Sequence, residues 1–389
     1  MSIEEVKEKM KRIQNAILEF LENESNEEEN YANFVKLIAE YRMIEDKYEV
    51  KSILRLVNII GNNHQRVHNF ISKIEQILLH FKKDINKYFS NSEIFQLFKK
   101  NKRILLFLIE EKIIIIDEYF VSQVTKVFFV AMKYAEYFAP EINPFLTEEF
   151  IQKYQNKNST LNEEEYIENI KKDVSEDFYD KRKKGENDSF LCELIRKNQV
   201  KEFSVYLNRN NISFDSCIPE SIFETNPLLV DIPNIKMIEY AAFYGSNDII
   251  RFLQINGEVK LTPYMWFYAI HSNNAELINY LEDNNILPLN NNYTAIFGES
   301  IKCHHIDVSK YIMHYLFPEK DVHNNIETNW NSNLYRYVVE NYNYCFFPDN
   351  MKYKKMFLYL CSYDYYSFVK AYLEEGSINI NVAIKTLMF

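Results

Sequence analysis

Glycine and proline are scarce in this 389-residue chain, which contains six glycines and nine prolines. Loops that cradle phosphate groups need several glycines close together, and here every glycine stands alone in the sequence. Long segments rich in Leu, Ile, Phe and Tyr at helical spacing account for much of the remainder. Together these features argue against a glycine-rich nucleotide-binding loop and predict an all-α protein with short connections.

The chain also lacks a long uninterrupted apolar run. Its most apolar segment, Arg103 to Val121, is broken by Glu110-Glu111-Lys112, so neither half is long enough to cross a bilayer. The start, Met1-Ser2-Ile3-Glu4-Glu5, has no apolar core of the kind that a secretory signal needs. Five cysteines without paired spacing predict reduced thiols. We therefore expect a cytoplasmic protein without a membrane span, with the nucleus as the alternative.

Positive charge is in deficit, and the formal net charge is −11. An acidic chain repels nucleic acid at long range, so we expect no nucleic-acid partner. One basic run opposes this trend and comprises Lys82, Lys83, Lys87, Lys99, Lys100, Lys102 and Arg103. We interpret the run as solvated helix faces, and an anionic partner is the alternative.

The N-terminal part is predicted to be a helical domain over residues 1–150, and a solenoid-like arrangement of its helices is one option. It opens with an apolar seam at alternating spacings of three and four residues: Ile3, Val6, Met10, Ile13, Ile17 and Phe20. The seam predicts one helix that packs on its own domain, and self-association through this helix is the alternative. Residues 151–188 have mixed charge and few apolar anchors, which predicts an exposed connector.

The remaining segment, residues 189–389, contains a repeated pattern. A first anchor and a closing Leu or Ile lie 12 residues apart in five places: Ile195 to Leu207, Ala241 to Leu253, Ala269 to Leu281, Ser300 to Ile312, and Cys361 to Leu373. A small or polar break separates two apolar stretches within each. The pattern predicts a helix, a turn and a second helix, and its recurrence predicts stacked repeats.

On these residues, the second half of the chain resembles a degenerate ankyrin-repeat array. Ala241-Ala242, Gly245, Ile249-Ile250, Leu253 and Gly257 fall where the ankyrin pattern has two alanines, a turn glycine, an Ile-Val pair, a leucine and a closing glycine. The whole chain is similar to the large family of ankyrin proteins expanded in parabasalid protozoa such as trichomonads. Segments 62–66, 89–95, 103–112, 185–189 and 238–243 carry that likeness. The resemblance implies an ankyrin-like α-solenoid after an N-terminal helical region.

The resemblance also implies a function and a site. Ankyrin-type arrays bind protein partners along a concave groove, through two variable positions on each inner helix. Carried over to this sequence, the groove positions are Lys197, Asn198, Phe243, Tyr244, His271, Ser272, Lys302, Cys303, Tyr363 and Asp364. We therefore expect a non-catalytic protein–protein interaction scaffold, with no cofactor and no metal. A partner segment with carboxylates and an apolar anchor suits this mixture of aromatic and basic residues.

Two other functions stay open. His64 and His68 stand four residues apart, as in a metal site on one helix face, so the N-terminal domain is alternatively a metal-binding or enzymatic one. Cys303-His304-His305 with His314 is the densest group of metal-capable residues, although adjacent histidines point about 100° apart on a helix. The third alternative is a structural protein that self-associates. No serine or cysteine stands in a nucleophile-elbow context, so we expect no enzyme.

Overall fold

The computed structural model describes residues 1–65, 67, 69–125, 133–149, 170, 174–317, 332–349, 351 and 354–376. Within these ranges the chain is helical, with no β-strand and one isolated β-bridge between Cys217 and Lys236. The predicted all-α class is confirmed. The helices form two compact units, which we call unit 1 (residues 1–84 and 260–389) and unit 2 (residues 85–259).

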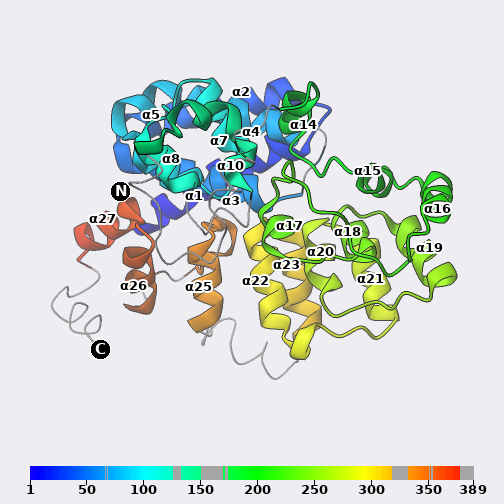
Figure 1. The fold of residues 1–389 in the computed structure, drawn as a ribbon. Coiled ribbons are helices and arrows are strands. Elements are labelled where there is room, and N and C mark those ends of the chain that lie inside the picture. Colours follow the sequence, from blue (N-terminus) through cyan, green and yellow to red (C-terminus); the bar gives the residue numbers. More distant parts are fainter. Residues whose placement is uncertain are drawn as a thin grey trace. The chain divides into compact units, whose positions relative to one another are not determined.

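Unit 1 combines the N-terminal helices with those of the C-terminal third (Figure 1). Its helices are α1 (Ile3–Glu22), α2 (Glu27–Glu40), α3 (Lys47–Asn63), α4 (Phe70–His80), α20 (Met265–His271), α21 (Ala275–Asp283), α22 (Tyr293–Cys303), α23 (Ile306–Tyr311), α25 (Ser332–Glu340), α26 (Lys354–Ser362) and α27 (Tyr366–Glu374). Short turns of other helix types are η1 (Met43–Glu45), η3 (Leu289–Asn291), η4 (Ile312–Leu316) and η5 (Tyr344–Phe346). Helix α5 (Lys82–Tyr88) spans the boundary between the units.

Unit 2 contains the intervening helices. They are α6 (Asn91–Phe98), α7 (Lys102–Glu110), α8 (Glu118–Val124), α10 (Tyr134–Tyr137), α11 (Ala139–Ile142), η2 (Asn143–Phe145), α14 (Phe178–Lys184), α15 (Phe190–Arg196), α16 (Val200–Arg209), α17 (Pro227–Asp231), α18 (Met237–Phe243) and α19 (Asn247–Gly257). Polar side chains start several of them. Ser90 and Glu93 form a capping box at α6, and Asn101 accepts from the backbone N–H groups of Arg103 and Ile104 at α7.

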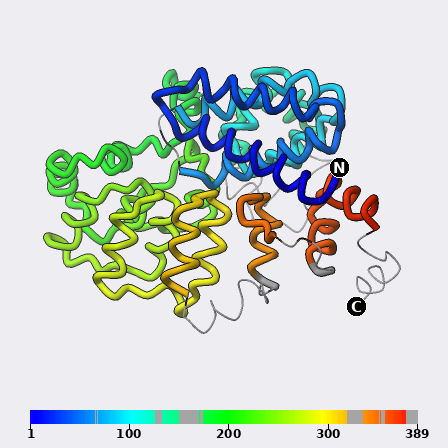
Figure 2. Tube along the Cα trace, turned by 180° about the vertical axis from the view of Figure 1, so that it is seen from behind, coloured from blue at the N-terminus to red at the C-terminus, as the bar shows by residue number. Residues whose placement is uncertain are grey.

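Helix α1 is integral to unit 1. Ser2 and Glu5 form a capping box at its start, and the predicted apolar seam is buried along its whole length, from Ile3 to Phe20. The helix contacts α2 and α4, and it also contacts α27 at the other end of the chain (Figure 2). The predicted packing of the seam inside the fold is confirmed by this burial, although α1 also contacts α27, which lies outside the predicted domain of residues 1–150. The seam is therefore not exposed for a coiled coil.

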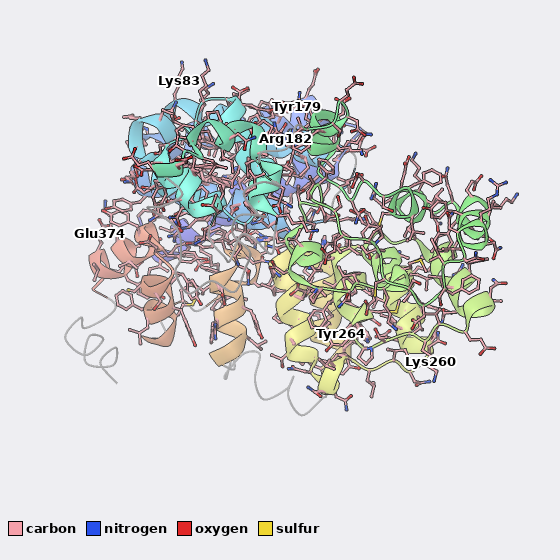
Figure 3. All side chains as sticks on the ribbon, viewed as in Figure 1. Lys83, Tyr179, Arg182, Lys260, Tyr264 and Glu374 are labelled. Atoms are coloured by element: carbon pink, nitrogen blue, oxygen red, sulfur yellow. The ribbon has the colours of Figure 1, made fainter. Side chains whose placement is uncertain are left out.

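The compact units differ from the predicted domains. Prediction placed residues 1–150 and 189–389 in separate domains, whereas α1–α4 pack in one unit with α20–α27. Most of the predicted connector, residues 151–169 and 171–173, lies outside the described residues. Its last part forms helix α14, which carries Arg182 (labelled in Figure 3). The side chain of Arg182 is only 4% exposed and pairs with Glu141 through distances of 2.7 and 2.8 Å. That part of the connector is a packed helix because Arg182 anchors it.

Six turns between paired helices share one geometry. Each contains a residue with positive φ: Asn198, Gly245, Asn273, His304, Tyr342 or Asp364. The N–H group of the next residue donates to the carbonyl five positions earlier, which is the longer bond of the Schellman motif. The acceptors are Leu194, Ala241, Ala269, Ser300, Val338 and Leu360, and all their side chains are buried. The repeated pattern in the sequence thus corresponds to a repeated helix-ending turn.

These turns define the register of the repeats. The predicted anchors Ala241, Ala269 and Ser300 are the carbonyl acceptors of their turns. The other two predicted anchors, Ile195 and Cys361, each follow the acceptor residue of their turn by one position. In the last pair, Cys361 is exposed and Leu373 is 44% exposed, while Leu360 and Tyr372 are fully buried. The prediction for this pair was wrong by one position, because it aligned a small residue, Cys361, where the fold buries Leu360.

Consecutive helix pairs contact one another within each unit. In unit 1, α20 contacts α22, α22 contacts α25 and α25 contacts α26; in unit 2, α15 contacts α18 and α16 contacts α19. The approach of α22 to α25 depends on Gly298, where an added Cβ atom would lie 2.8 Å from the ring of Tyr337. A larger residue at this position would push the two helices apart.

A second set of hydrogen bonds joins successive pairs. The residue after the positive-φ position donates from its side chain to a backbone carbonyl of the preceding pair. Ser246 Oγ donates to Ile195 O at 2.6 Å, Asn343 Nδ2 to Ile301 O at 2.9 Å, and Tyr365 Oη to Val339 O at 2.7 Å. In each case the acceptor lies three positions before the positive-φ residue of the preceding turn. Three different residue types therefore perform the same structural task.

Candidate functional site

Four of the ten predicted groove positions are buried: Phe243, His271, Ser272 and Cys303. Ser272 Oγ donates to the carbonyl of Ala269, and the imidazole of His271 bonds to Glu299 at 2.5 Å. These side chains contact their own unit and do not lie on a surface that a partner can reach. They are part of the packing between helices.

The predicted positions in unit 2 mainly organise the turn between α15 and α16. Lys197 is exposed and pairs with Glu193 at 2.5 Å. Asn198 Nδ2 donates to Asp248 at 2.9 Å, and its Oδ1 accepts from the N–H of Ile249 at 3.2 Å, so it ties this turn to the start of α19. Tyr244, which is half-buried, has the Arg196 guanidinium 5.9 Å from its ring centre.

Tyr363 and Asp364 belong to a surface cluster, which we call the Tyr/Arg surface, in which Tyr48, Asp364 and Tyr366 are exposed and the other members are half-buried. Its members come from α3 and from the turn and start of α27: Tyr48, Lys51, Arg55, Tyr363, Asp364 and Tyr366. Asp364 Oδ2 lies 2.6 Å from Lys51 Nζ and 3.0 Å from Arg55 Nη2. The hydrogen bond from Lys51, with the charge of Arg55, holds the pKa of Asp364 below its usual value.

Two tyrosine rings form the apolar part of the Tyr/Arg surface. The rings of Tyr48 and Tyr366 stack with centroids 4.1 Å apart and planes 16° apart. Tyr48 is 42% exposed and Tyr366 is 38% exposed. Sequence reasoning found Tyr363 and Asp364 but missed Tyr48, Lys51 and Arg55, because they lie more than 300 positions away in the chain.

Unit 1 also contains a buried histidine cluster, which we define as His64, His271, His304 and His305. His64 Nδ1 lies 2.7 Å from the carbonyl of Cys303, and its Nε2 lies 3.0 Å from Glu22 Oε1. The ring nitrogens of His304 bond to Gln14 at 3.1 Å and to the carbonyl of Asn341 at 3.0 Å. Burial, with the nearby His64, lowers the pKa of His304 to about 3, so this ring is neutral.

His305 is the exceptional member of the histidine cluster. Its ring centroid lies 4.6 Å from that of His64. Neither ring nitrogen has a partner at hydrogen-bond distance and angle among the described residues. Burial, with the nearby His64, holds the pKa of His305 well below its usual value, although the backbone of His271 acts in the opposite direction. His305 is therefore a neutral, buried imidazole next to His271.

The predicted metal ligands are only partly brought together. His68, the predicted partner of His64, lies outside the described residues. His314 is exposed, whereas His304 and His305 are buried. His304 has positive φ and His305 is the N-cap residue that precedes α23, so the two adjacent rings do not follow helical geometry. The histidine that joins the cluster from elsewhere is His271, which sequence reasoning assigned to a groove.

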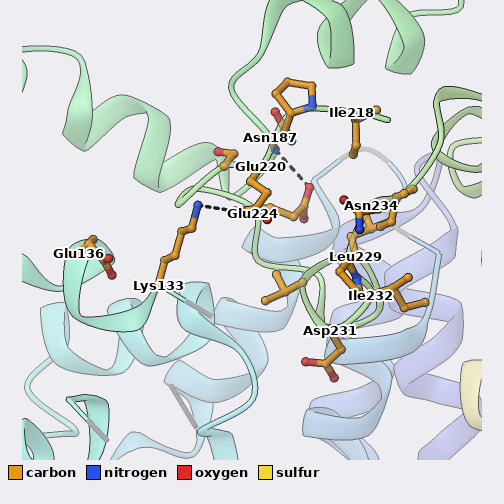
Figure 4. A pocket seen from close by; sticks show the side chains of 15 residues that line it. Lys133, Glu136, Asn187, Ile218, Glu220, Glu224, Leu229, Asp231, Ile232 and Asn234 are labelled. Carbon is orange, nitrogen blue, oxygen red and sulfur yellow. Dashed lines mark hydrogen bonds and ion pairs between the residues drawn. The ribbon is translucent and has the colours of Figure 1, made fainter. Parts of the chain in front are cut away.

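Unit 2 contains a cavity of about 530 Å³ with an acidic lining (Figure 4). Glu224 accepts from the backbone N–H groups of Asn187, Thr225 and Asn226, and Lys133 pairs with Glu220 at 2.8 Å. Glu136 lines the same cavity, and its Oε2 is buried without a hydrogen-bond partner among the described residues. The lining can accept hydrogen bonds or a positive group from a small ligand.

A buried lysine, Lys102, lies close to this cavity's acidic groups. Its Nζ donates to the carbonyl of Ile222 at 2.9 Å and lies over the rings of Tyr134 and Tyr137. Burial lowers the pKa of Lys102 to about 7, against the opposing charges of Glu224 and Glu136. The basic run was interpreted as solvated, and for Lys102 and Arg103 this was wrong, since both are buried.

Within the described ranges, no helix combines the length and the apolar character needed to cross a membrane. Comparison of the chain with models of protein families, with curated proteins and with solved structures finds no match.

Proposed function

We propose that this chain is a non-catalytic scaffold of paired helices that binds a protein partner through the Tyr/Arg surface of unit 1. The observation that carries the proposal is the exposed stack of Tyr48 on Tyr366. Tyrosine is among the residues that dominate binding energy at protein interfaces, because its ring offers a large apolar area at a low cost in side-chain entropy.

The charged groups beside the stack define the chemistry of the partner. Lys51 and Arg55 share a single carboxylate oxygen of Asp364, so each retains donors that can meet a further acceptor. A partner segment with a carboxylate next to an apolar side chain matches this arrangement. Such a segment would place its apolar group on the two rings and its carboxylate near the basic side chains.

The proposal keeps the predicted class of function and changes the site. Tyr363 and Asp364 remain in it, while the buried groove positions, such as His271 and Cys303, serve the fold. Arg55 also donates to the carbonyl of Tyr363 at 2.7 Å, which fixes the turn that presents Asp364 and Tyr366. The surface is therefore held in place before a partner arrives, which reduces the entropy lost on binding.

Affinity capture from the source cell with the full chain as bait tests the proposal. The Tyr48→Ala/Tyr366→Ala variant is compared with the wild type and with a Tyr264→Ala/Tyr315→Ala control, whose tyrosines are 52% and 75% exposed but lie outside the Tyr/Arg surface. We expect at least one protein that the wild type and the control retain and that the first variant loses by more than about tenfold. Equal recovery by all three baits would exclude this surface as the binding site.

A further inference from the structure

Three metal-capable side chains meet where α20 contacts α22 in unit 1. Glu299 and Cys303 lie four residues apart on α22, so both point to the same side of that helix, and His271 ends α20. One ligand atom from each residue, a ring nitrogen, a carboxylate oxygen and the thiol sulfur, lies within 4.8 Å of the other two. This trio differs from the His64/His68 pair that the sequence suggests, and it shares only Cys303 with the Cys303/His304/His305 group.

We propose that His271, Glu299 and Cys303 form a binding site for one Zn²⁺ ion. Nitrogen, carboxylate oxygen and thiolate sulfur are the ligand types that zinc accepts in proteins. Three protein ligands leave a fourth position for a water molecule or another group. Hard ions such as Mg²⁺ and Ca²⁺ prefer all-oxygen sites, so the thiol selects against them.

The surroundings of the trio suit a preformed site. His271 and Cys303 are almost fully buried, whereas the side chains of Glu299 and Lys302 are 13% and 35% exposed. The trio is therefore nearest to solvent on the side of Glu299. The bond between His64 Nδ1 and the carbonyl of Cys303 fixes the backbone of the proposed sulfur ligand from the residue that follows α3.

His305 supplies a second observation at the same place. It is a buried imidazole, about 2% exposed, whose ring nitrogens have no hydrogen-bond partner at normal geometry among the described residues. A buried polar group without such a partner costs free energy, which a bound ion or its water ligand would offset. His305 follows the proposed ligand Cys303 by two positions and lies near His271, which makes it the residue we expect to bond to the group in the fourth position.

Zinc binding requires a limited rearrangement. Ligand atoms around tetrahedral zinc lie roughly 3.3–3.8 Å apart, given Zn–N, Zn–O and Zn–S distances of about 2.0–2.3 Å. The 2.5 Å contact between His271 and Glu299 must therefore lengthen by about 1 Å. The thiol of Cys303 must also release its proton to solvent, because the thiolate is the metal ligand. If His271 binds through Nε2, that nitrogen must likewise give up the proton that it donates to Glu299. Lys302 Nζ lies 3.1 Å from Glu299 Oε1, so Lys302 and the ion would then share the Glu299 carboxylate.

Titration of the chelator-treated full chain with Co²⁺, followed by displacement with Zn²⁺, tests the proposal. Co²⁺ bound by a thiolate gives a charge-transfer absorption band that a carboxylate–histidine site lacks. We expect one Co²⁺ per chain with this band, displaced by one equivalent of Zn²⁺. Cys303→Ala should abolish the band and weaken Zn²⁺ binding by roughly 100-fold or more, whereas Cys361→Ser, at an exposed cysteine, should change neither.

Circular dichroism of each variant shows whether it remains folded. Glu299→Gln provides a second test, because it keeps the shape of the side chain while removing its charge, and it should weaken Zn²⁺ binding with the thiolate band retained at higher Co²⁺. Absence of the band in the wild type would overturn the proposal and leave His271 and Glu299 as a structural ion pair only. Persistence of the band in folded Cys303→Ala would overturn it as well.

Discussion

The side-chain amide of Gln14 donates to Oδ1 of Asn343 at 3.0 Å, although 329 positions separate the two residues. Both side chains are fully buried, and Gln14 Oε1 also accepts from the backbone N–H of Tyr344 at 2.7 Å. Asn343 in turn donates to the carbonyl of Ile301. Helix α1 is thereby bonded to the turn that follows α25, which Asn343 also bonds to α22.

The register of the last helix pair leads to a first prediction. Leu360→Ala should lower the free energy of unfolding by about 2–4 kcal/mol, because the substitution leaves a cavity at a fully buried site. Cys361→Ala, one residue later and exposed, should change it by less than about 0.5 kcal/mol. Urea denaturation of both variants measures the difference. A larger loss of stability in Cys361→Ala than in Leu360→Ala would instead support the register that the sequence predicted.

The hydrogen bonds between successive pairs lead to a second prediction. Tyr365→Phe removes the hydroxyl that donates to Val339 and leaves that carbonyl without this donor. The expected loss of stability is about 1–2 kcal/mol. Tyr366→Phe is the matched control, since the neighbouring tyrosine is 38% exposed, and it should be neutral. Equal thermal unfolding of the two variants would mean that the inter-pair bond contributes nothing.

The anchoring of α14 leads to a third prediction. Glu141→Ala leaves the buried guanidinium of Arg182 without its carboxylate, which should destabilise the local packing by about 3 kcal/mol. Trypsin should then cut within α14, which contains four consecutive basic residues, at least about tenfold faster than in the wild type. Glu176→Ala, at an exposed acidic residue nearby, serves as the control. Unchanged cleavage in Glu141→Ala would show that Arg182 does not hold this helix.

The burial of Lys102 leads to a fourth prediction, on pH. The folded pKa is about 7, whereas the ordinary lysine value is 10.5. Between these values the unfolded chain binds a proton that the folded chain has released, so the contribution of Lys102 to stability rises with pH, by at most about 1.4 kcal/mol per unit. The titratable groups that influence Lys102 most are Glu224, Glu136 and Lys133.

A Lys102→Met variant separates this contribution from the others. It should be more stable than the wild type at pH 7, and its advantage should shrink as the pH is raised to 9.5. Chemical denaturation at several pH values within this range measures both trends. A constant difference between the two proteins across the range would contradict the lowered pKa.

The sequence predicted the features that depend on local periodicity. The seam from Ile3 to Phe20 identified α1 and its buried face, and the 12-residue interval identified the helix pairs. Three anchors, Ala241, Ala269 and Ser300, were placed correctly because small side chains occupy these close helix contacts. Those patterns arise from a single helix or one helix pair, so neighbouring residues are sufficient to reveal them.

Features that depend on distant segments were not predictable in this way. The inter-pair donor is Ser246, Asn343 or Tyr365, and no common residue type marks that position. The Tyr/Arg surface combines α3 with the turn before α27, and the proposed zinc site combines His271 with α22. Lys102 is another example. Its charge led to the prediction of a solvent-exposed side chain, and only the packing of unit 2 shows that it is buried.

A double-mutant cycle between Gln14 and Asn343 tests most directly the central claim, that the N-terminal helix and the C-terminal helix pairs form one folded unit. Gln14→Leu and Asn343→Leu should each lower the free energy of unfolding by about 2–3 kcal/mol, because each leaves buried polar groups unpaired. Together they should cost about 1–2 kcal/mol less than the sum of the separate effects. A coupling energy within about 0.3 kcal/mol of zero, in variants that remain folded, would contradict the claim.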